Sequence, residues 1–177
     1  MKIKAIIMAA GQGTRMHSQL PKVLHPLLGQ PLIQYSVNTT ARVTAALPVV
    51  VIGHSGEAVQ QEVGEQAEYV VQAEQLGTGH AVQQAASLMR GNADLVLVVA
   101  ADMPLLTEET LQRLVDVQQA NRGPITLLTL LADQPRGFGR VVRDAQNNVQ
   151  AIVEEAQATP EQLAIKELNA GAYCIRA

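Results

Sequence analysis

Residues 3–16, IKAIIMAAGQGTRM, place an apolar strand directly before a loop that holds two glycines and an arginine. Gly11 and Gly13 let the backbone turn tightly and bring its N–H groups close to a bound group. Arg15 and, a little later, Lys22 add fixed positive charge, which suits a polyphosphate leaving group. The segment therefore predicts a strand that ends at a nucleotide site, with a simple glycine-rich turn as the alternative.

Two better-known phosphate loops do not fit this segment. A P-loop has a lysine and then Ser or Thr directly after its last glycine, whereas Gly13 is followed by Thr14 and Arg15. The dinucleotide fingerprint has a third glycine or alanine at the position where this chain has Met16. The loop therefore belongs to neither type.

The chain has 177 residues, of which 47% are hydrophobic and 16% charged, and this composition indicates one folded domain rather than a disordered chain. A net charge of −3 and an aromatic content of 2% give no basic or stacking surface for a nucleic acid polymer. We therefore expect any nucleotide ligand to be a small molecule.

Cys174 is the only cysteine, so an internal disulfide cannot form and an oxidising compartment gains no support. Its place between Tyr173 and Ile175 predicts a buried strand residue, with a catalytic thiol as the alternative. No apolar run reaches membrane-spanning length, and the N-terminal segment has no signal-peptide core. We expect a cytoplasmic protein with no membrane partner.

Short apolar runs alternate with longer segments of helical period. The runs predict strands at residues 4–8, 48–52, 68–71, 94–100 and 124–131, and the periodic segments predict helices at 31–43, 57–64, 78–88 and 107–120, the last capped by Thr107. Continuous apolar strands separated by helices indicate an α/β fold with a largely parallel sheet covered on both faces. Such sheets bind ligands beyond the carboxyl ends of their strands, so the glycine loop and residues 101–104 should share one edge.

Beyond residue 131 the pattern changes to short strands at 137–142, 149–154 and 168–175, with polar linkers and a short helix at 161–165. The chain ends at or just after the last strand, an unusual place for a domain to stop. We therefore expect a fragment or an abbreviated protein.

Asp102 follows the strand at 94–100, the most strongly predicted one of the chain, and precedes Pro104, which cannot continue regular pairing. A carboxylate there can hold Mg²⁺ against phosphate oxygens, because Mg²⁺ is usually bound by one or two carboxylates together with substrate phosphates. The alternative is an aspartate that only caps a turn.

Residues 72–81, QAEQLGTGHA, end one strand and open a helix. Gln72 offers both a donor and an acceptor, as recognition of a base edge requires, and Gly77 allows a planar ring to approach closely. Thr78 is a candidate cap of the helix. The alternative is a strand–helix turn with incidental polar residues, and His80 is expected to be a helix-face residue rather than a metal ligand.

Together these segments occur in the order of a known family. The chain resembles the pyrophosphorylase domain of bacterial N-acetylglucosamine-1-phosphate uridyltransferases, which are sugar nucleotidyltransferases. The resemblance covers nearly the whole chain and rests on the segments AAGQGTRM (9–16), LPKVLHPLLGQPLIQY (20–35), QAEQLGTGHAVQQA (72–85), ADMPLL (101–106), GFGRVVRD (137–144), IVEEAQATPEQ (152–162) and ELNAGAY (167–173). The run QAEQLGTGHA is far more specific than the first loop, and it favours a uridylyltransferase over glucose-1-phosphate or cytidylyl relatives.

The resemblance implies a Rossmann-like nucleotide-diphospho-sugar transferase fold, with a mixed, mostly parallel sheet and helices on both faces, incomplete at the C-terminus. It implies a single nucleotidyltransferase domain over residues 1–177, with a nucleotide-binding part at 1–131 and a partial sugar-binding part at 132–177. The implied reaction transfers a uridylyl group from UTP to N-acetylglucosamine 1-phosphate and releases pyrophosphate, with Mg²⁺ as cofactor. The oligomeric state stays open.

The resemblance also implies roles for individual residues. Nucleotide binding is implied for Ala10, Gly11, Gly13, Gln72, Gly77 and Thr78, the last three at the uracil. Arg15 and Lys22 would act on the phosphates, and Asp102 would supply one Mg²⁺ ligand. Gly139, Glu154 and Asn169 would hold the N-acetylglucosamine moiety; a solvated face at Glu154 and a β-bulge at Asn169 are the alternatives.

The chain departs from the family pattern at several positions. Ala100 and Ala101 replace an aromatic residue and a glycine, so the methyl group of Ala101 is a candidate obstacle to a ligand. Ala156, Gln157 and Ala170 replace a lysine, an aspartate and a threonine, and the later asparagine ligand to Mg²⁺ lies beyond the chain, as does the acetyltransferase β-helix. The alternatives are a nucleotidyltransferase for another sugar or polyol phosphate and an inactive nucleotide-binding module.

Overall fold

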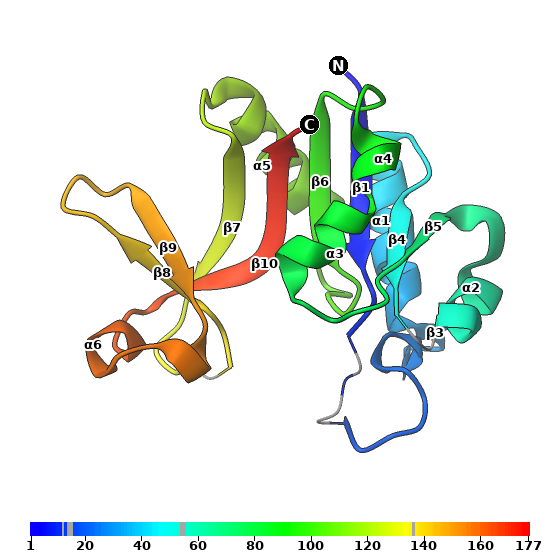
Figure 1. Cartoon of the computed structure of the whole chain (residues 1–177), viewed down its shortest axis with the longest axis horizontal. Coiled ribbons are helices and arrows are strands. Elements are labelled where there is room, and N and C mark those ends of the chain that lie inside the picture. Colours follow the sequence, from blue (N-terminus) through cyan, green and yellow to red (C-terminus); the bar gives the residue numbers. More distant parts are fainter. Residues whose placement is uncertain (12, 14–15, 54–55, 136) are drawn as a thin grey trace. The chain divides into compact units, whose positions relative to one another are not determined.

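The computed structural model describes residues 1–11, 13, 16–53, 56–135 and 137–177 (Figure 1). They form two units: unit 1 comprises Met1–Thr126 with Tyr173–Ala177, and unit 2 comprises Leu127–Ala172. None of the helices formed by the described residues is both long and apolar enough to cross a membrane.

The sheet of unit 1 is built around β1 (Ile3–Met8), which lies between β4 (Val49–Ile52) and β6 (Leu95–Ala100) and is parallel to both. β5 (Glu68–Val71) adds a further parallel strand beside β4. The last residues of β10 (Glu167–Arg176) pair antiparallel with β6. This mixed, mostly parallel sheet confirms the predicted fold class, and its four parallel strands begin and end within one residue of the predicted positions.

One face of this sheet is covered by α3 (Thr78–Gln84) and α4 (Ala86–Met89), which Figure 1 shows in front of the strands. Side chains alternate along each strand, so Ile6 and Val98 point to the same face and share a buried cluster with residues of both helices. This packing fixes the position of α3, and with it the end of the loop that connects β5 to α3.

The opposite face carries α1 (Leu32–Thr44) and α5 (Glu108–Ala120), which pack against each other as well as against the strands. β4 is buried along its whole length and β6 along its first five residues, so both faces of the central strands need cover. Helices on both faces are therefore confirmed. Thr107 caps α5 as predicted, its hydroxyl accepting a hydrogen bond from the backbone N–H of Thr110 at 3.2 Å.

Two expectations for the segment after β5 are wrong. The single helix predicted at residues 78–88 divides at Ala85, whose backbone N–H donates to the carbonyl of Val82, three residues back, at 3.1 Å. Thr78 is not the cap of α3, because the capping position belongs to Gly77, with φ +97°. A glycine adopts this backbone conformation at little cost, whereas a threonine does not.

Short elements complete unit 1. They are α2 (Gly56–Val63), close to the helix predicted at 57–64, the 3₁₀ turns η2 (Lys22–Leu24) and η3 (Gly64–Gln66), and a small hairpin of β2 (Pro26–Leu27) and β3 (Gln30–Pro31). The hairpin was not predicted. Its two-residue loop places Leu28 and Gly29 at φ +49° and +87°, which a two-residue hairpin of type I′ requires.

Unit 2 contains β8 (Arg140–Arg143), β9 (Val149–Val153), most of β7 (Ile125–Leu131) and the first residues of β10. β8 pairs antiparallel with β9 and with β10, and β7 also pairs with β10. The 3₁₀ turn η4 (Glu155–Gln157) and α6 (Pro160–Leu163) follow β9, and α6 begins with a capping box between Thr159 and Gln162.

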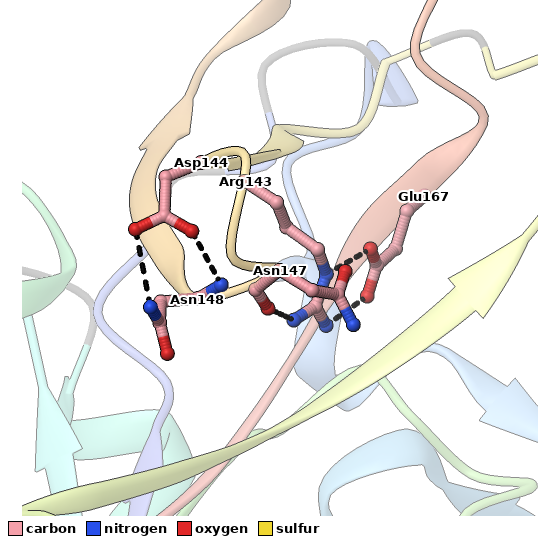
Figure 2. A network of polar contacts seen from close by, with 5 residues as sticks. All are labelled: Arg143, Asp144, Asn147, Asn148 and Glu167. Atoms are coloured by element: carbon pink, nitrogen blue, oxygen red, sulfur yellow. Dashed lines mark hydrogen bonds and ion pairs between the residues drawn. The ribbon is translucent and has the colours of Figure 1, made fainter.

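A polar network ties the β8–β9 turn to β10 (Figure 2). Arg143 donates two hydrogen bonds of 2.7 Å to the two carboxylate oxygens of Glu167, and these lower the pKa of that carboxyl although partial burial opposes them. Asp144 accepts a 2.8 Å hydrogen bond from the backbone N–H of Asn148, which lowers the pKa of Asp144. The network is structural, because it fixes the turn that brings β9 back beside β8.

Candidate functional site

The backbone that follows β1 is held on two sides. Ala9 N–H donates to the carbonyl of Val51 at 2.8 Å, and the carbonyl of Ala10 accepts a 2.7 Å hydrogen bond from Gln75 Nε2. Gly53 approaches so closely that a Cβ atom there would lie 2.9 Å from the Ala10 oxygen. The carboxyl end of β1 is therefore a fixed surface.

A cleft of about 350 Å³ opens beside this surface. Five of the six residues predicted to bind the nucleotide line it, and only Gly13 is elsewhere. The lining residues are Met8, Ala10, Gly11, Gln72, Gln75, Gly77, Thr78, Ala81 and Ala100. Gln75 was not singled out from the sequence, because its role depends on a contact with a residue 65 positions away.

Gln72 forms the inner wall of this first cleft. Its backbone N–H continues the strand pairing by donating to Ile52 at 2.8 Å, and only 3% of its surface is exposed. Its side-chain nitrogen donates to the carbonyl of Gly77 at 3.2 Å, which closes the loop between β5 and α3 on itself. A buried amide is stable only when its polar atoms find partners, so this loop holds Gln72 in one position.

A second cleft of about 250 Å³ begins at the same glycine loop. Met8 and Gly11 line both clefts, so the two openings share one edge at the end of β1. The residues around the second cleft are Met8, Ala9, Gly11, Gly13, Lys22, Val23 and Asp102. The prediction that the glycine loop and residues 101–104 share one edge of the sheet is confirmed.

Lys22 and Asp102 are paired across the second cleft, with Lys22 Nζ donating to Asp102 Oδ2. Both side chains are about one-third exposed. A pair that is this open to water contributes at most about 1 kcal/mol. A bound phosphate can therefore replace Asp102 as the partner of Lys22 at small cost. Arg15, the other predicted phosphate ligand, lies outside the described residues.

Gly13 is the residue that lets Lys22 lie against the loop. Its φ of +60° is in the left-handed region, and a Cβ atom on it would stand 2.5 Å from Lys22 Cβ. Gly11 differs, because a Cβ atom built there meets nothing within 4 Å. The space beside Gly11 is therefore open and is part of the two clefts that this residue lines.

A divalent metal fits this site only if the substrate shares in its coordination. Among the described residues, no three His, Cys, Asp or Glu side chains gather as a metal cage. Asp102 lines the second cleft together with Gly11 and Gly13 and offers carboxylate oxygens to it. One carboxylate together with phosphate oxygens is the donor set that Mg²⁺ commonly takes in nucleotide enzymes.

The two alanines before Asp102 lie differently from each other. Ala100 lines the first cleft, whereas Ala101 has no exposed surface and lines neither cleft. The backbone N–H of Ala101 donates to Met8 at 3.0 Å, continuing the pairing of β6 with β1. The residue next to a ligand in the first cleft is therefore Ala100, and the expected obstruction by Ala101 is absent from both clefts.

The three residues predicted to hold the sugar come together within unit 2. Asn169 N–H donates to the carbonyl of Gly139 at 2.8 Å, and a Cβ atom on Gly139 would lie 3.2 Å from Glu154 Oε1. A side chain at position 139 would therefore crowd Glu154 and Ile152, whose Cγ2 would lie 3.0 Å from that Cβ atom, and the glycine lets the backbone lie close to both. A carboxylate and an amide are groups that can bind the hydroxyls of a sugar.

Arg140, which the sequence did not single out, is a buried cation of unit 2. Its guanidinium donates to the carbonyl of Phe138 and pairs with Glu155 at 3.2 Å, and Glu155 also accepts from the backbone N–H of Gly137 at 2.7 Å. These contacts hold residues 137–139 in place beside Glu154.

Cys174 is a core residue, as predicted. Its side chain has no exposed surface, and burial raises the pKa of its thiol to about 11, with the charge of Arg176 opposing the shift. His80 lies on α3 and its ring nitrogens contact Gln72 and Gln84, each at 3.0 Å, which agrees with a helix-face residue.

The fold has solved counterparts. A UDP-glucose pyrophosphorylase complexed with UDP-glucose matches it with a TM-score of 0.74 and 20% identity, covering 99% of this chain and 76% of that chain. At this identity the likeness shows the fold alone, an α/β fold with a mixed, mostly parallel sheet.

Sequence relatives are more similar to the chain than these solved structures are. It is 47% identical to the bifunctional protein GlmU of an Exiguobacterium species over 169 residues, which are 96% of this chain and 38% of that protein. GlmU of a Geobacillus species is also 47% identical, over 98% of this chain and again 38% of that protein. The chain thus spans about two-fifths of the length of these relatives.

A family model described as the MobA-like NTP transferase domain matches residues 5–165, and the chain belongs to this family. It is a nucleotidyltransferase domain, and the resemblance stated from the sequence motifs is confirmed. The roles of individual residues stay predictions.

Proposed function

We propose that this domain transfers a uridylyl group from UTP to N-acetylglucosamine 1-phosphate, forming UDP-N-acetylglucosamine and pyrophosphate. The observation that carries the proposal is the pair of clefts that meet at Gly11, one lined by amide and backbone groups and the other by a lysine and an aspartate. A nucleoside triphosphate has the same two-part chemistry, a neutral base with ribose and an anionic phosphate chain. The high identity to GlmU proteins supports the choice of nucleotide and sugar.

The base and ribose occupy the first cleft in this proposal. Gln72 provides a side-chain amide, and Gly77 and Thr78 provide backbone close to the wall of the cleft. Burial of Gln72 and its hydrogen bond to Gly77 support a role in base selection, because a pre-positioned polar group discriminates more strongly than a mobile one.

The phosphates occupy the second cleft. Gly11 and Gly13 bring the backbone near them, and Lys22 supplies a fixed charge. In this arrangement the Lys22–Asp102 pair opens: Lys22 turns to phosphate, and the freed carboxylate of Asp102 is available to a divalent ion. Mg²⁺ bound there would neutralise phosphate charge and orient phosphate oxygens.

The sugar moiety is assigned to Gly139, Glu154 and Asn169 of unit 2. A phosphate oxygen of the sugar phosphate attacks the α-phosphorus of UTP in line, and the bond from that phosphorus to the bridging oxygen breaks to release pyrophosphate. Such transfers depend on positioning and charge neutralisation more than on proton transfer. No general base is therefore assigned to this chain.

The Lys22→Ala variant tests the proposal. Loss of one charge that stabilises the phosphates should lower the rate of pyrophosphate release at least about 100-fold. Calorimetry should show that UTP still binds, because the contacts to the base lie in the other cleft. Lys166→Ala is the matched control: Lys166 also forms an exposed ion pair, with Asp133 at 2.6 Å, but it lies in neither cleft. An unchanged rate in Lys22→Ala would remove Lys22 from the reaction.

A further inference from the structure

His80 does not line the first cleft, but its ring contacts Gln72, which does. Gln72 Nε2 lies 3.0 Å from His80 Nδ1 and 3.2 Å from the carbonyl oxygen of Gly77. His80 is half-buried and does not line the cleft, whereas Gln72 does. Any influence of His80 on a ligand therefore passes through Gln72.

The contact with Gly77 decides which way the Gln72 amide is turned. A carbonyl oxygen can only accept, so the amide group that faces Gly77 is the NH₂ and not the oxygen. The same NH₂ group faces His80 Nδ1, which must then be the unprotonated, accepting nitrogen of the imidazole. The proton of neutral His80 consequently lies on Nε2.

Gln84 completes the arrangement on the far side of the ring. Its amide lies 3.0 Å from His80 Nε2. Gln84 Nε2 also donates to the carbonyl oxygen of His80 at 3.2 Å. Because Nε2 of His80 carries the proton, Gln84 must turn its oxygen there by a half-turn about its last torsion, and it gives up the hydrogen bond to that carbonyl. Gln72 is buried and Gln84 only half-buried, so the hydrogen bonds of Gln72 set the imidazole tautomer and Gln84 adapts to it.

Both hydrogens of the Gln72 amide are now used inside the protein, one on Gly77 and one on His80. Its oxygen, Oε1, is the atom that the amide can offer to a ligand in the first cleft. An oxygen acceptor pairs with the ring N3–H of uracil or thymine. It faces a lone pair at N3 of cytosine, which leaves the buried acceptor unpaired and is costly.

We propose that His80 is a positioning residue that fixes the Gln72 amide with its oxygen toward the first cleft, and so selects a nucleotide whose base carries a ring N–H over a cytidine nucleotide. This inference rests on the proposed function for the location of the base. It assigns His80 no contact with substrate.

The test combines a measurement on the free protein with one on nucleotide binding. Two-bond ¹H–¹⁵N spectra of the 177-residue chain at mildly alkaline pH should show the Nε2–H tautomer of His80. They should also show a Gln72 side-chain amide that is protected from solvent exchange. A His80 protonated on Nδ1, or an unprotected Gln72 amide, would overturn the inference without any ligand present.

Binding of UTP and CTP is then compared by calorimetry in three variants. His80→Phe keeps a ring but removes the acceptor, and the preference for UTP over CTP should fall about fivefold, the equivalent of one lost hydrogen bond. His80→Asn restores an acceptor near the position of Nδ1 and should keep the preference within about twofold. Gln83→Ala, an exposed change on the same helix, should leave it unchanged.

The outcomes separate this inference from the proposed function. An unchanged UTP preference in His80→Phe overturns the positioning role. If the wild-type chain binds UTP and CTP equally although the Gln72 amide is protected, the proposed function is wrong about the uridine nucleotide. The proposed selection of a base by Gln72 is then wrong as well. A clear UTP preference with an unprotected Gln72 amide overturns this inference alone. The spectra of wild-type protein and the His80→Asn variant keep the test decisive if His80→Phe does not fold.

Discussion

Gly11 offers the sharpest perturbation of the candidate site, because a methyl group there enters the clefts and touches nothing else. Gly11 lines both clefts, is exposed, and does not have a left-handed backbone conformation. A Cβ atom on it has no protein atom within 4 Å. The substitution Gly11→Ala therefore tests whether a ligand must approach the backbone at this point.

The structure sets the expected magnitudes. The free energy of unfolding should stay within about 0.5 kcal/mol of wild type, as for other exposed positions without special contacts. UTP affinity should fall, because a ligand lying on this backbone must shift to avoid the methyl group. A shift of that kind costs about 1–3 kcal/mol in well-packed sites, which corresponds to roughly a 5- to 150-fold rise in Kd.

The assay pairs thermal unfolding with calorimetric titration of UTP. Gly79→Ala is the matched control, since Gly79 is also exposed, also has open space at its Cβ position and lines neither cleft. Its UTP affinity should equal that of wild type. If Gly11→Ala binds UTP as tightly as Gly79→Ala does, the ligand does not lie on the Gly11 backbone and the placement of the nucleotide is refuted.

Three further predictions concern the fold that supports the site. Gly53→Ala should lower the free energy of unfolding by about 1–3 kcal/mol in a urea titration, because its Cβ would lie 2.9 Å from the Ala10 oxygen; an unchanged midpoint would contradict this packing. Cys174 should resist a thiol reagent at mildly alkaline pH until the protein unfolds, since burial raises its pKa to about 11, and fast labelling of folded protein would count against its burial. Arg143 lowers the pKa of Glu167 in the folded state, so the stabilisation is present above the unfolded pKa and is lost as the pH falls through the folded one. The stability gap between wild type and Glu167→Gln should therefore narrow below about pH 4, and a gap that widens there would be inconsistent with the pair.

Local patterns predicted the parallel part of the sheet well. The runs that became β4 and β6 are continuously apolar, which is typical of parallel strands that are buried on both faces of a sheet. The edge shared by Gly11 and Asp102 followed from the same reasoning, because strand direction fixes which loops meet. Each of these inferences needs only a short stretch of sequence.

The features that sequence reasoning missed depend on distant contacts or on backbone strain. Gln75 becomes a site residue only through its hydrogen bond to Ala10, and Lys22 meets Asp102 from 80 positions away. The hairpin around Leu28 gave no signal, because leucine is an uncommon residue at positive φ and the strands are two residues long. Periodicity also could not locate the break at Ala85, where the apolar pattern continues across the turn.

The central claim is that this domain joins UTP to a sugar phosphate, and the most direct test is pyrophosphate release by the 177-residue chain with UTP, Mg²⁺ and N-acetylglucosamine 1-phosphate. The account predicts release that requires both substrates and disappears in Lys22→Ala. Bound UTP without any release would contradict it, and the domain would then be a nucleotide-binding module rather than a transferase.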